Sequence, residues 1–193
     1  MTHPTRPAVL TKFDLVTGLS PDREPLRRKL SNMRGMFSDE AAYEAQLQKE
    51  DVLLYEFYDM GVPALETETA YGTSITYAGK VGREFNMTKG HFHERLETSE
   101  IYFCLSGNGL MLMENPEGDV QIAEFTPGQA VYVPARYAHR SINIHPTDPL
   151  ITFFAFPGDA GHDYGTIETK GFRKIVLATD SGYEVVDNPK WRG

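Results

Sequence analysis

Residues 91–107 read HFHERLETSEIYFCLSG, a stretch that joins a metal-ligand pattern to an apolar strand. His91 and His93 are two positions apart, so on a β-strand their side chains point to the same face. Glu100 begins the run EIYFCLS and stands seven positions before Gly107. Two imidazoles and a carboxylate that converge would suit a divalent first-row metal such as iron, manganese, nickel or zinc.

A second segment completes the pattern about 40 residues later. Gly128, Pro134, His139 and Asn143 follow one another with five, four and three residues between them. The two segments together resemble the two-part signature of the cupins, which are β-barrel proteins. This resemblance adds a third imidazole, that of His139, to the expected metal site.

The match to the cupin signature has two departures and offers two candidates for the acidic ligand. Gly82 lies further from the histidine pair than the usual glycine, and Arg136 stands where a glycine is often found. Glu97 also fits the loose spacing of the acidic ligand. We prefer Glu100, because it keeps its spacing to Gly107 and opens a strand, whereas Glu97 lies in a polar loop.

Strand alternation extends the site beyond the metal ligands. Glu100, Tyr102 and Cys104 share one face of their strand, so a Glu100 that faces the barrel interior brings Tyr102 with it. The Tyr102 hydroxyl would then meet a ligand, although an ordinary barrel-lining aromatic is the alternative. Cys104 has no basic neighbour in sequence to lower its pKa, so we expect a small buried hydrophobic residue.

The remaining sequence predicts an all-β fold with a helical start. Residues 24–33 and 38–49 read as short helices, with Ser38 as N-cap of the second. Short strands separated by turn residues follow from Val52, as is typical of a β-sandwich or barrel. The predicted strands are 52–59, 71–77, 83–93, 100–106, 109–115, 120–125, 130–133, 139–145, 150–156, 172–178 and 183–187. We expect a single cupin domain over 1–193, a jelly-roll (double-stranded β-helix) barrel over 51–193 with an N-terminal extension over 1–50.

Composition narrows the class of partner. The chain has 193 residues, a formal net charge of −8 and one cysteine. The negative charge argues against nucleic acid or an anionic membrane as partner, although a local site can still bind a phosphorylated substrate. No apolar run reaches the roughly 18–20 residues of a membrane span, and residues 1–6 lack the pattern of a secretory signal. A single cysteine suits the reducing cytoplasm.

Several longer strings resemble one narrow group, the cupin-type glucose-6-phosphate isomerases, known mainly from archaea. These strings are RRKLSNMRGMF (27–37), GKVGREFNMTKGHFH (79–93), VYVPARYAHRSIN (131–143), DAGHDYGTI (159–167), KGFRKIV (170–176) and VVDNPKW (185–191). They cover most of the chain and lie partly outside the barrel core, so they are more specific than the metal motif.

The resemblance implies an interconversion of glucose 6-phosphate and fructose 6-phosphate at a metal held by His91, His93, Glu100 and His139. Iron is the expected metal, and manganese, nickel and zinc also suit the site. Hydroxyls and backbone amides would bind the phosphate. The matching positions are Tyr55, Ser74, Thr88, Gly90 and Tyr164, with Ser74 in place of a threonine. His162, in the GHDYG loop, is a candidate for contact with the sugar hydroxyls or ring oxygen.

The assignment of Thr88 to the phosphate site requires an irregularity in its strand. Strict alternation puts Thr88 and His91 on opposite faces, so both can line one site only if Gly90 marks a bulge or twist. Thr88 is otherwise a plain strand threonine, and for Tyr55 the alternative is core packing.

We expect a cis-enediolate mechanism in which a metal stabilises the developing charge. Glu100 would move the proton, Tyr102 would orient O1 or O2, and His162 would assist ring opening. A direct hydride shift is the competing route. The rival functions are a cupin dioxygenase with the same ligand set, a non-catalytic sugar-phosphate-binding cupin, and isomerisation of mannose 6-phosphate. The resemblance also points to a homodimer.

Overall fold

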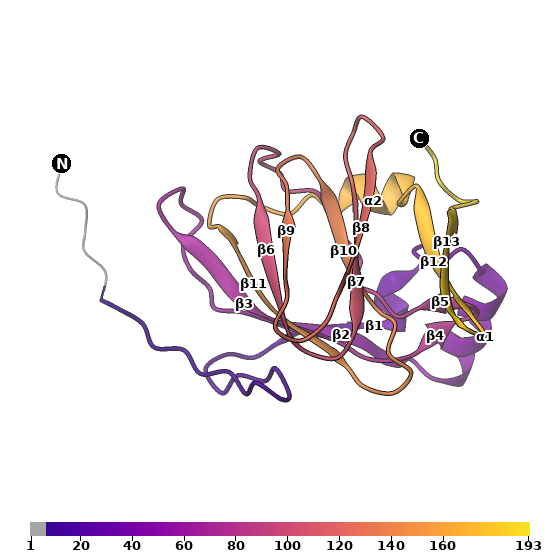
Figure 1. Ribbon diagram of the computed structural model, residues 1–193, viewed down its shortest axis with the longest axis horizontal. Helices are drawn as coiled ribbons and strands as arrows, with labels where there is room; N and C mark the ends of the chain where they lie inside the picture. The colour runs from indigo at the N-terminus through magenta and orange to yellow at the C-terminus, as the bar shows by residue number, and fades with distance from the viewer. Residues whose placement is uncertain (1–6) are drawn as a thin grey trace.

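Antiparallel strands form three sheets in residues 7–193, the part of the chain that the computed structural model describes (Figure 1). The largest sheet contains, in order, β1 (Leu26–Lys29), β2 (Leu53–Asp59), β3 (Thr69–Thr76), β11 (Leu150–Pro157), β6 (Glu100–Ser106) and β9 (Ala130–Val133). A second sheet contains β10 (Ala138–Asn143), β7 (Gly109–Glu114) and β8 (Val120–Phe125). The third contains β13 (Gly182–Asp187), β12 (Lys174–Thr179), β5 (Glu84–Phe85) and β4 (Lys80–Val81).

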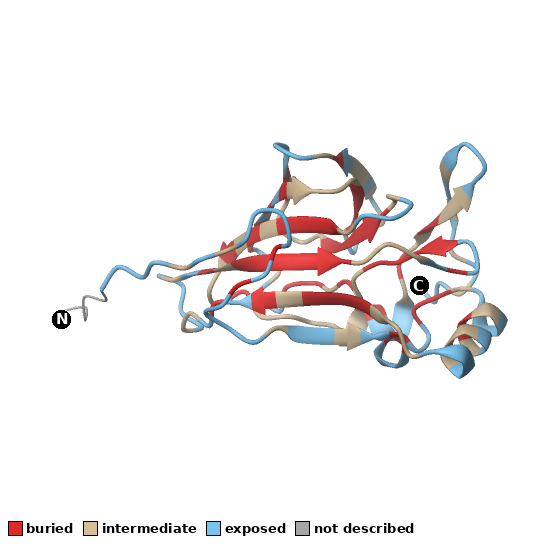
Figure 2. Cartoon of the chain, turned by 90° about the horizontal axis from the view of Figure 1, so that it is seen from below, coloured by how far each residue is buried: buried red, intermediate tan, exposed pale blue. Residues whose placement is uncertain are grey.

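The three-stranded sheet is the middle layer of the molecule. Met111 and Met113 of β7 pack into one core with side chains of the largest sheet, such as Tyr102. Leu110 and Leu112 alternate with them and pack into another core, which includes Phe172 of the C-terminal segment. Figure 2 shows the resulting pattern, with buried residues along the central strands and exposed residues in the connecting loops. This architecture confirms the all-β fold predicted from the sequence.

Most predicted strands agree with the structure to within about two residues, but two segments were predicted wrongly. Residues 24–33 form strand β1 and a 3-10 helix (Leu30–Met33) instead of an α-helix. Leu26, Leu30 and Met33 have helical spacing, yet Leu26 to Lys29 pair with β2, whose edge offers free backbone groups. Residues 83–93 form only β5 and isolated bridges at Met87, His91 and Phe92.

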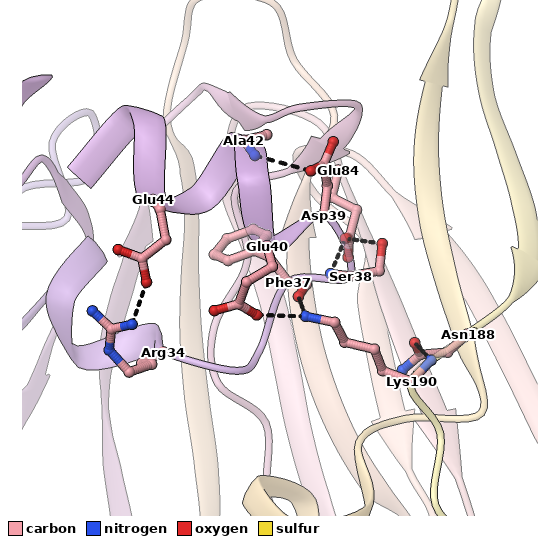
Figure 3. A network of polar contacts seen from close by, with 10 residues as sticks. All are labelled: Arg34, Phe37, Ser38, Asp39, Glu40, Ala42, Glu44, Glu84, Asn188 and Lys190. Carbon is pink, nitrogen blue, oxygen red and sulfur yellow. Dashed lines mark hydrogen bonds and ion pairs between the residues drawn. The ribbon is translucent and has the colours of Figure 1, made fainter. Parts of the chain in front are cut away.

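The described part of the predicted N-terminal extension packs against the sheets, and its strand β1 pairs with β2. Helix α1 (Glu40–Lys49) forms within the predicted range 38–49, but its N-cap is Asp39, which accepts a hydrogen bond from the Ala42 N–H. Ser38, the predicted cap, instead donates its N–H and its hydroxyl to the Glu84 carboxylate (Figure 3).

The C-terminal segment contacts the start of helix α1 and the residues before it. Lys190 donates to the Phe37 carbonyl at 2.9 Å and to the Glu40 carboxylate at 2.7 Å (Figure 3).

A short helix, α2 (Gly165–Lys170), was not predicted and follows the GHDYG loop. No helix among residues 7–193 is long and apolar enough to cross a membrane, and residues 1–6, which lack a signal pattern, lie outside the described residues.

Candidate metal centre and adjoining pocket

The four predicted metal ligands converge at one end of the middle layer. His91 and His139 face each other as a bridged antiparallel pair, with each backbone N–H donating to the other's carbonyl, at 3.3 Å and 3.1 Å. Glu100 is the first residue of β6. One ligand atom from each of His91, His93, Glu100 and His139 lies within 4.8 Å of all the others, so this group can hold a metal ion.

The atoms of this group fit a metal ion. Glu100 Oε2 lies 3.1 Å from His93 Nε2 and 2.9 Å from His139 Nε2. His91 Nε2 is buried without a hydrogen-bond partner, and His139 Nε2 also lacks one, because its contact with Glu100 does not have hydrogen-bond geometry. Buried polar atoms are rarely left unpaired, and a metal would use both lone pairs.

Neighbouring groups orient two of the imidazoles. Thr98 Oγ1 donates its only proton to the Arg95 carbonyl, so it accepts at 2.8 Å from Nδ1–H of His93. His139 Nδ1 lies 3.3 Å from the Tyr137 carbonyl, which can only accept. Both contacts assign the proton to Nδ1 and leave Nε2 with a lone pair directed at the cluster.

The ionisation of the cluster also suits a divalent cation. Burial by itself would raise the pKa of Glu100, but His139, His93 and His91 outweigh it and hold that pKa well below its usual range. Burial, followed by His139 and His162, lowers the pKa of His91 well below 6.5. The cluster is therefore a carboxylate among nitrogen donors, of which His91 is held neutral. Burial and the Glu100 charge raise the pKa of Tyr102, so its hydroxyl remains a donor.

A pocket beside the cluster brings together every residue predicted to contact substrate. Its lining includes Glu100 and Tyr102 of β6 with Tyr55, Ser74, Thr88, Gly90, His162 and Tyr164. His91 and His139 also line it, whereas His93 is a buried ligand that does not. These residues come from strands and loops far apart in sequence, so the convergence is a property of the fold.

The hydroxyl groups lie around the segment that precedes His91. Thr88 Oγ1 accepts the Ser141 N–H at 3.0 Å, which leaves its own proton to donate. The Tyr55 hydroxyl accepts the Lys89 N–H at 3.4 Å. Burial raises the pKa of Tyr55, and it raises the pKa of Tyr164 to about 12, so both phenols are protonated donors at neutral pH.

Gly90 has the bulge geometry that the sequence argument required. Its φ is +79°, a left-handed conformation that glycine adopts without a Cβ penalty. This departure from strand geometry lets Thr88 and His91 line the same pocket. Strict alternation would have placed them on opposite faces.

The GHDYG loop is tied to the metal-binding segment through its backbone. Phe92 and Asp163 exchange two backbone hydrogen bonds, at 3.2 Å and 2.8 Å. As a result the His162 ring lies 4.5 Å from that of His91, centroid to centroid, and stacks on Tyr164 at 5.8 Å. Burial lowers the pKa of His162, which favours a neutral imidazole in the pocket.

Five lining residues were not predicted as site residues: Phe57, Asp59, Ser141, Phe154 and Phe156. Alternation could have found most of them, because Phe57 and Asp59 share a strand face with Tyr55. Ser141 shares the face of His139 in the same way. Only the pairing of β11 with β6 brings Phe154 opposite Tyr102, so Phe154 and Phe156 had no local signal.

The residues judged less suitable lie outside the centre. Glu97 is exposed and pairs with Arg136 at 3.2 Å. Arg136, at a usual glycine position, has a φ of +73°, the only positive value at a non-glycine among residues 7–193. Cys104 is buried, and burial raises its pKa to about 11, which agrees with a packing role.

Comparison with known proteins identifies strong relatives. A family model described as glucose-6-phosphate isomerase matches residues 27–192. A glucose-6-phosphate isomerase of Pyrococcus furiosus is 45% identical over 94% of this chain and 95% of its own length. One of Thermococcus gammatolerans is 45% identical over 93% and 94%, respectively. A solved oxalate oxidase matches 53% of this chain and 49% of its own at 14% identity and a TM-score of 0.44, which adds nothing to the family assignment.

Proposed function

Because the chain belongs to the glucose-6-phosphate isomerase family, we propose that it interconverts glucose 6-phosphate and fructose 6-phosphate in a metal-dependent reaction. The observation that carries the proposal is a single pocket with two chemically different ends. One end is the buried cluster of three imidazoles and a carboxylate. The other end is lined by hydroxyl groups and Gly90.

His91, His93, Glu100 and His139 would hold one divalent ion, and we propose Fe²⁺, with Mn²⁺, Ni²⁺ or Zn²⁺ as substitutes. When bound, such an ion would act as a Lewis acid toward the oxygens on C1 and C2. The orphaned Nε2 atoms of His91 and His139 support this use of the cluster.

We assign the phosphate to the hydroxyl end of the pocket. Tyr55, Ser74, Thr88 and Tyr164 would donate O–H groups, and Gly90 would donate its N–H. The left-handed backbone at Gly90 and the absence of a side chain allow close approach to an anion. Neutral donors suit a dianion because they can bind it without a compensating ion pair.

Glu100, Tyr102 and His162 would carry out the proton chemistry. Glu100 would take the proton from one carbon and return it to the other through a cis-enediolate, while Tyr102 orients O1 or O2. His162 would assist ring opening. The lowered pKa of Glu100 keeps its carboxylate ionised and makes it a weak base.

Isomerisation in heavy water tests the role of Glu100. Deuterium at the transferred carbon supports proton transfer, because the proton exchanges with solvent while it is held on the base. Complete retention of the substrate hydrogen would exclude this route and favour a hydride shift.

The activity itself is tested by a coupled assay of fructose 6-phosphate conversion. Turnover should disappear after chelation and return when Fe²⁺, Mn²⁺, Ni²⁺ or Zn²⁺ is added singly. Absence of turnover with every metal would contradict the proposal and favour a non-catalytic sugar-phosphate-binding protein. Oxygen consumption would indicate a dioxygenase, and parallel assays with mannose 6-phosphate define the substrate range.

We further propose a cytoplasmic homodimer. The single cysteine suits a reducing compartment. Ile101 and Tyr132 are opposite each other on the outer face of β6 and β9, with 43% and 60% of their surface exposed, and Phe103 beside them is 38% exposed. A second copy would cover this apolar patch. Light scattering should give twice the chain mass, and a monomer mass would contradict the proposal.

A further inference from the structure

Arg140 is a buried cation that the mechanism above does not use. Only 3% of its surface is exposed, and none of residues 7–193 forms an ion pair with it within 4 Å. Its Nε is buried without a hydrogen-bond partner. The carboxyl groups of Glu84 and Glu114 act on this charge only from beyond ion-pair distance, and a buried charge without a close partner is costly.

The side chain lies behind the pocket and not inside it. His139 and Ser141 of β10 face the pocket, and Arg140, between them, faces the opposite core. Its guanidinium lies 4.3 Å from the centre of the Phe172 ring. One Nη donates to Met87 Sδ at 3.0 Å and the other donates to the Lys89 carbonyl. Arg140 therefore holds the segment before His91 through hydrogen bonds to Met87 and Lys89.

The contact with Lys89 determines where the next amide points. The Lys89–Gly90 peptide is trans, so its carbonyl and its N–H point in opposite directions. With the carbonyl turned toward Arg140, the Gly90 N–H is turned away from it, toward the side where Gly90 lines the pocket. That N–H has no hydrogen-bond acceptor among the described residues.

The same peptide is closely packed from behind. A Cβ added at Gly90 would lie 2.6 Å from Phe172 Cε2 and 3.1 Å from Arg140 Cβ. Arg140 and Phe172 thus form a rigid wall against which the peptide rests. The pocket side is left open for a ligand.

We propose that Arg140 is a positioning residue for the phosphate group: it holds the Lys89–Gly90 peptide so that the Gly90 N–H donates to a phosphate oxygen. Its unpaired charge also polarises this peptide and favours a dianion in front of it. The inference rests on the proposed function in taking the bound anion to be the phosphate of the substrate.

Arg173 provides a matched control. It lies over the Trp191 ring at 4.3 Å, as Arg140 lies over Phe172, and its Nε is likewise buried without a partner. Like Arg140 it does not line the substrate pocket, but among the described residues only Arg140 donates a side-chain hydrogen bond to the Lys89 carbonyl. Replacement of Arg173 by methionine therefore reproduces the loss of a stacked guanidinium without affecting the Lys89–Gly90 peptide.

The test compares R140M, R140K and R173M with the wild type, all loaded with Zn²⁺. Calorimetry measures binding of inorganic phosphate, and initial rates give KM and kcat for fructose 6-phosphate. R140M should bind phosphate roughly 10- to 100-fold more weakly and raise KM similarly, with about threefold or less change in kcat, as expected for loss of a charge-assisted contact. R140K should recover part of the loss, and R173M should resemble the wild type.

A second measurement does not depend on folding of the variants. In ¹⁵N-labelled, Zn²⁺-loaded wild type, the Gly90 amide resonance should shift on addition of phosphate. An unmoved Gly90 amide, or wild-type phosphate affinity in R140M, would overturn the inference. If the wild type binds phosphate through Gly90 but converts no sugar phosphate, and R140M binds phosphate more weakly, the proposed function fails and the role of Arg140 in anion binding stands.

Discussion

At the scale of single residues, the centre depends on how each imidazole and the carboxylate are held. Glu100 is the only anionic ligand, and it contacts two of the three histidines. His93 is oriented by Thr98, and His139 by the Tyr137 carbonyl. Glu100 was preferred to Glu97 because it opens a strand. In the structure Glu100 points inward and contacts the imidazoles, whereas Glu97 is exposed and pairs with Arg136.

Replacement of Glu100 by glutamine should abolish stable metal binding. The change removes the only negative charge in the ligand set, so the loss should exceed the roughly 10–100-fold cost of deleting an outer-shell partner. Metal content after gel filtration measures it. Glu97→Gln is the control, because its exposed pair with Arg136 has no part in the cluster. Equal metal content in the two variants would contradict the assignment.

The metal-free protein should lose stability as the pH falls from 7 to 5. The pKa of His91 is lower in the folded state than its ordinary 6.5, so the unfolded state binds more protons below that pH. Each extra proton contributes up to about 1.4 kcal/mol per pH unit to the loss. Urea unfolding with chelator present should show this slope, and His91→Asn should flatten it. An unchanged slope in the variant would refute the explanation.

At the scale of elements, alternation and turn residues predicted most strands, because a strand with one buried face carries its own pattern. Strand β1 was missed, since its sequence has helical spacing and only pairing with β2 makes it extended. The long strand predicted over 83–93 forms only as β5 and isolated bridges, and Gly90 lies between two of these bridges. The sequence argument required a bulge at Gly90, and the structure gives Gly90 a φ of +79°.

Two glycine substitutions separate backbone strain from packing. Gly128→Ala should cost about 1–2 kcal/mol, because φ is +89° but no atom lies within 4 Å of the added Cβ. Gly90→Ala pays a similar strain and also meets Phe172, which should add about 1–3 kcal/mol. Denaturant unfolding measures both. Equal losses of unfolding free energy in the two variants would show that Phe172 and Arg140 move aside for the added methyl group without a measurable loss of stability.

At the scale of the whole molecule, three layers bring distant segments to one pocket. The largest sheet supplies Tyr55, Ser74, Glu100 and Tyr102, and the middle sheet supplies His139. The C-terminal segment closes over the N-terminal one through Lys190 and, by way of Phe172, supports the wall behind Gly90. The cluster that could hold a metal therefore joins loops and strands from much of the chain.

Metal removal should lower the melting temperature of the whole protein. An ion present at about 100 times its dissociation constant contributes about 2.7 kcal/mol to folding. For a chain of this length, that corresponds to roughly 5–11 °C. Differential scanning calorimetry before and after chelation measures the shift, and Glu100→Gln should show a much smaller one. The same melting temperature with and without metal would contradict a site formed only in the folded state.

The sequence by itself indicated the cluster that could hold a metal and the strand pattern, because these depend on residue types at short, regular spacings, and it indicated the family through longer matching strings. Parity along a strand is local, so His91, His93, Glu100 and Tyr102 could be placed before any strand was paired. Tertiary structure alone decided the apolar walls of Phe154 and Phe156, the strand β1 and the place of Arg140 behind Gly90. Each of these depends on which strands pair and which layers stack, and such contacts join residues whose separation in sequence carries no signal.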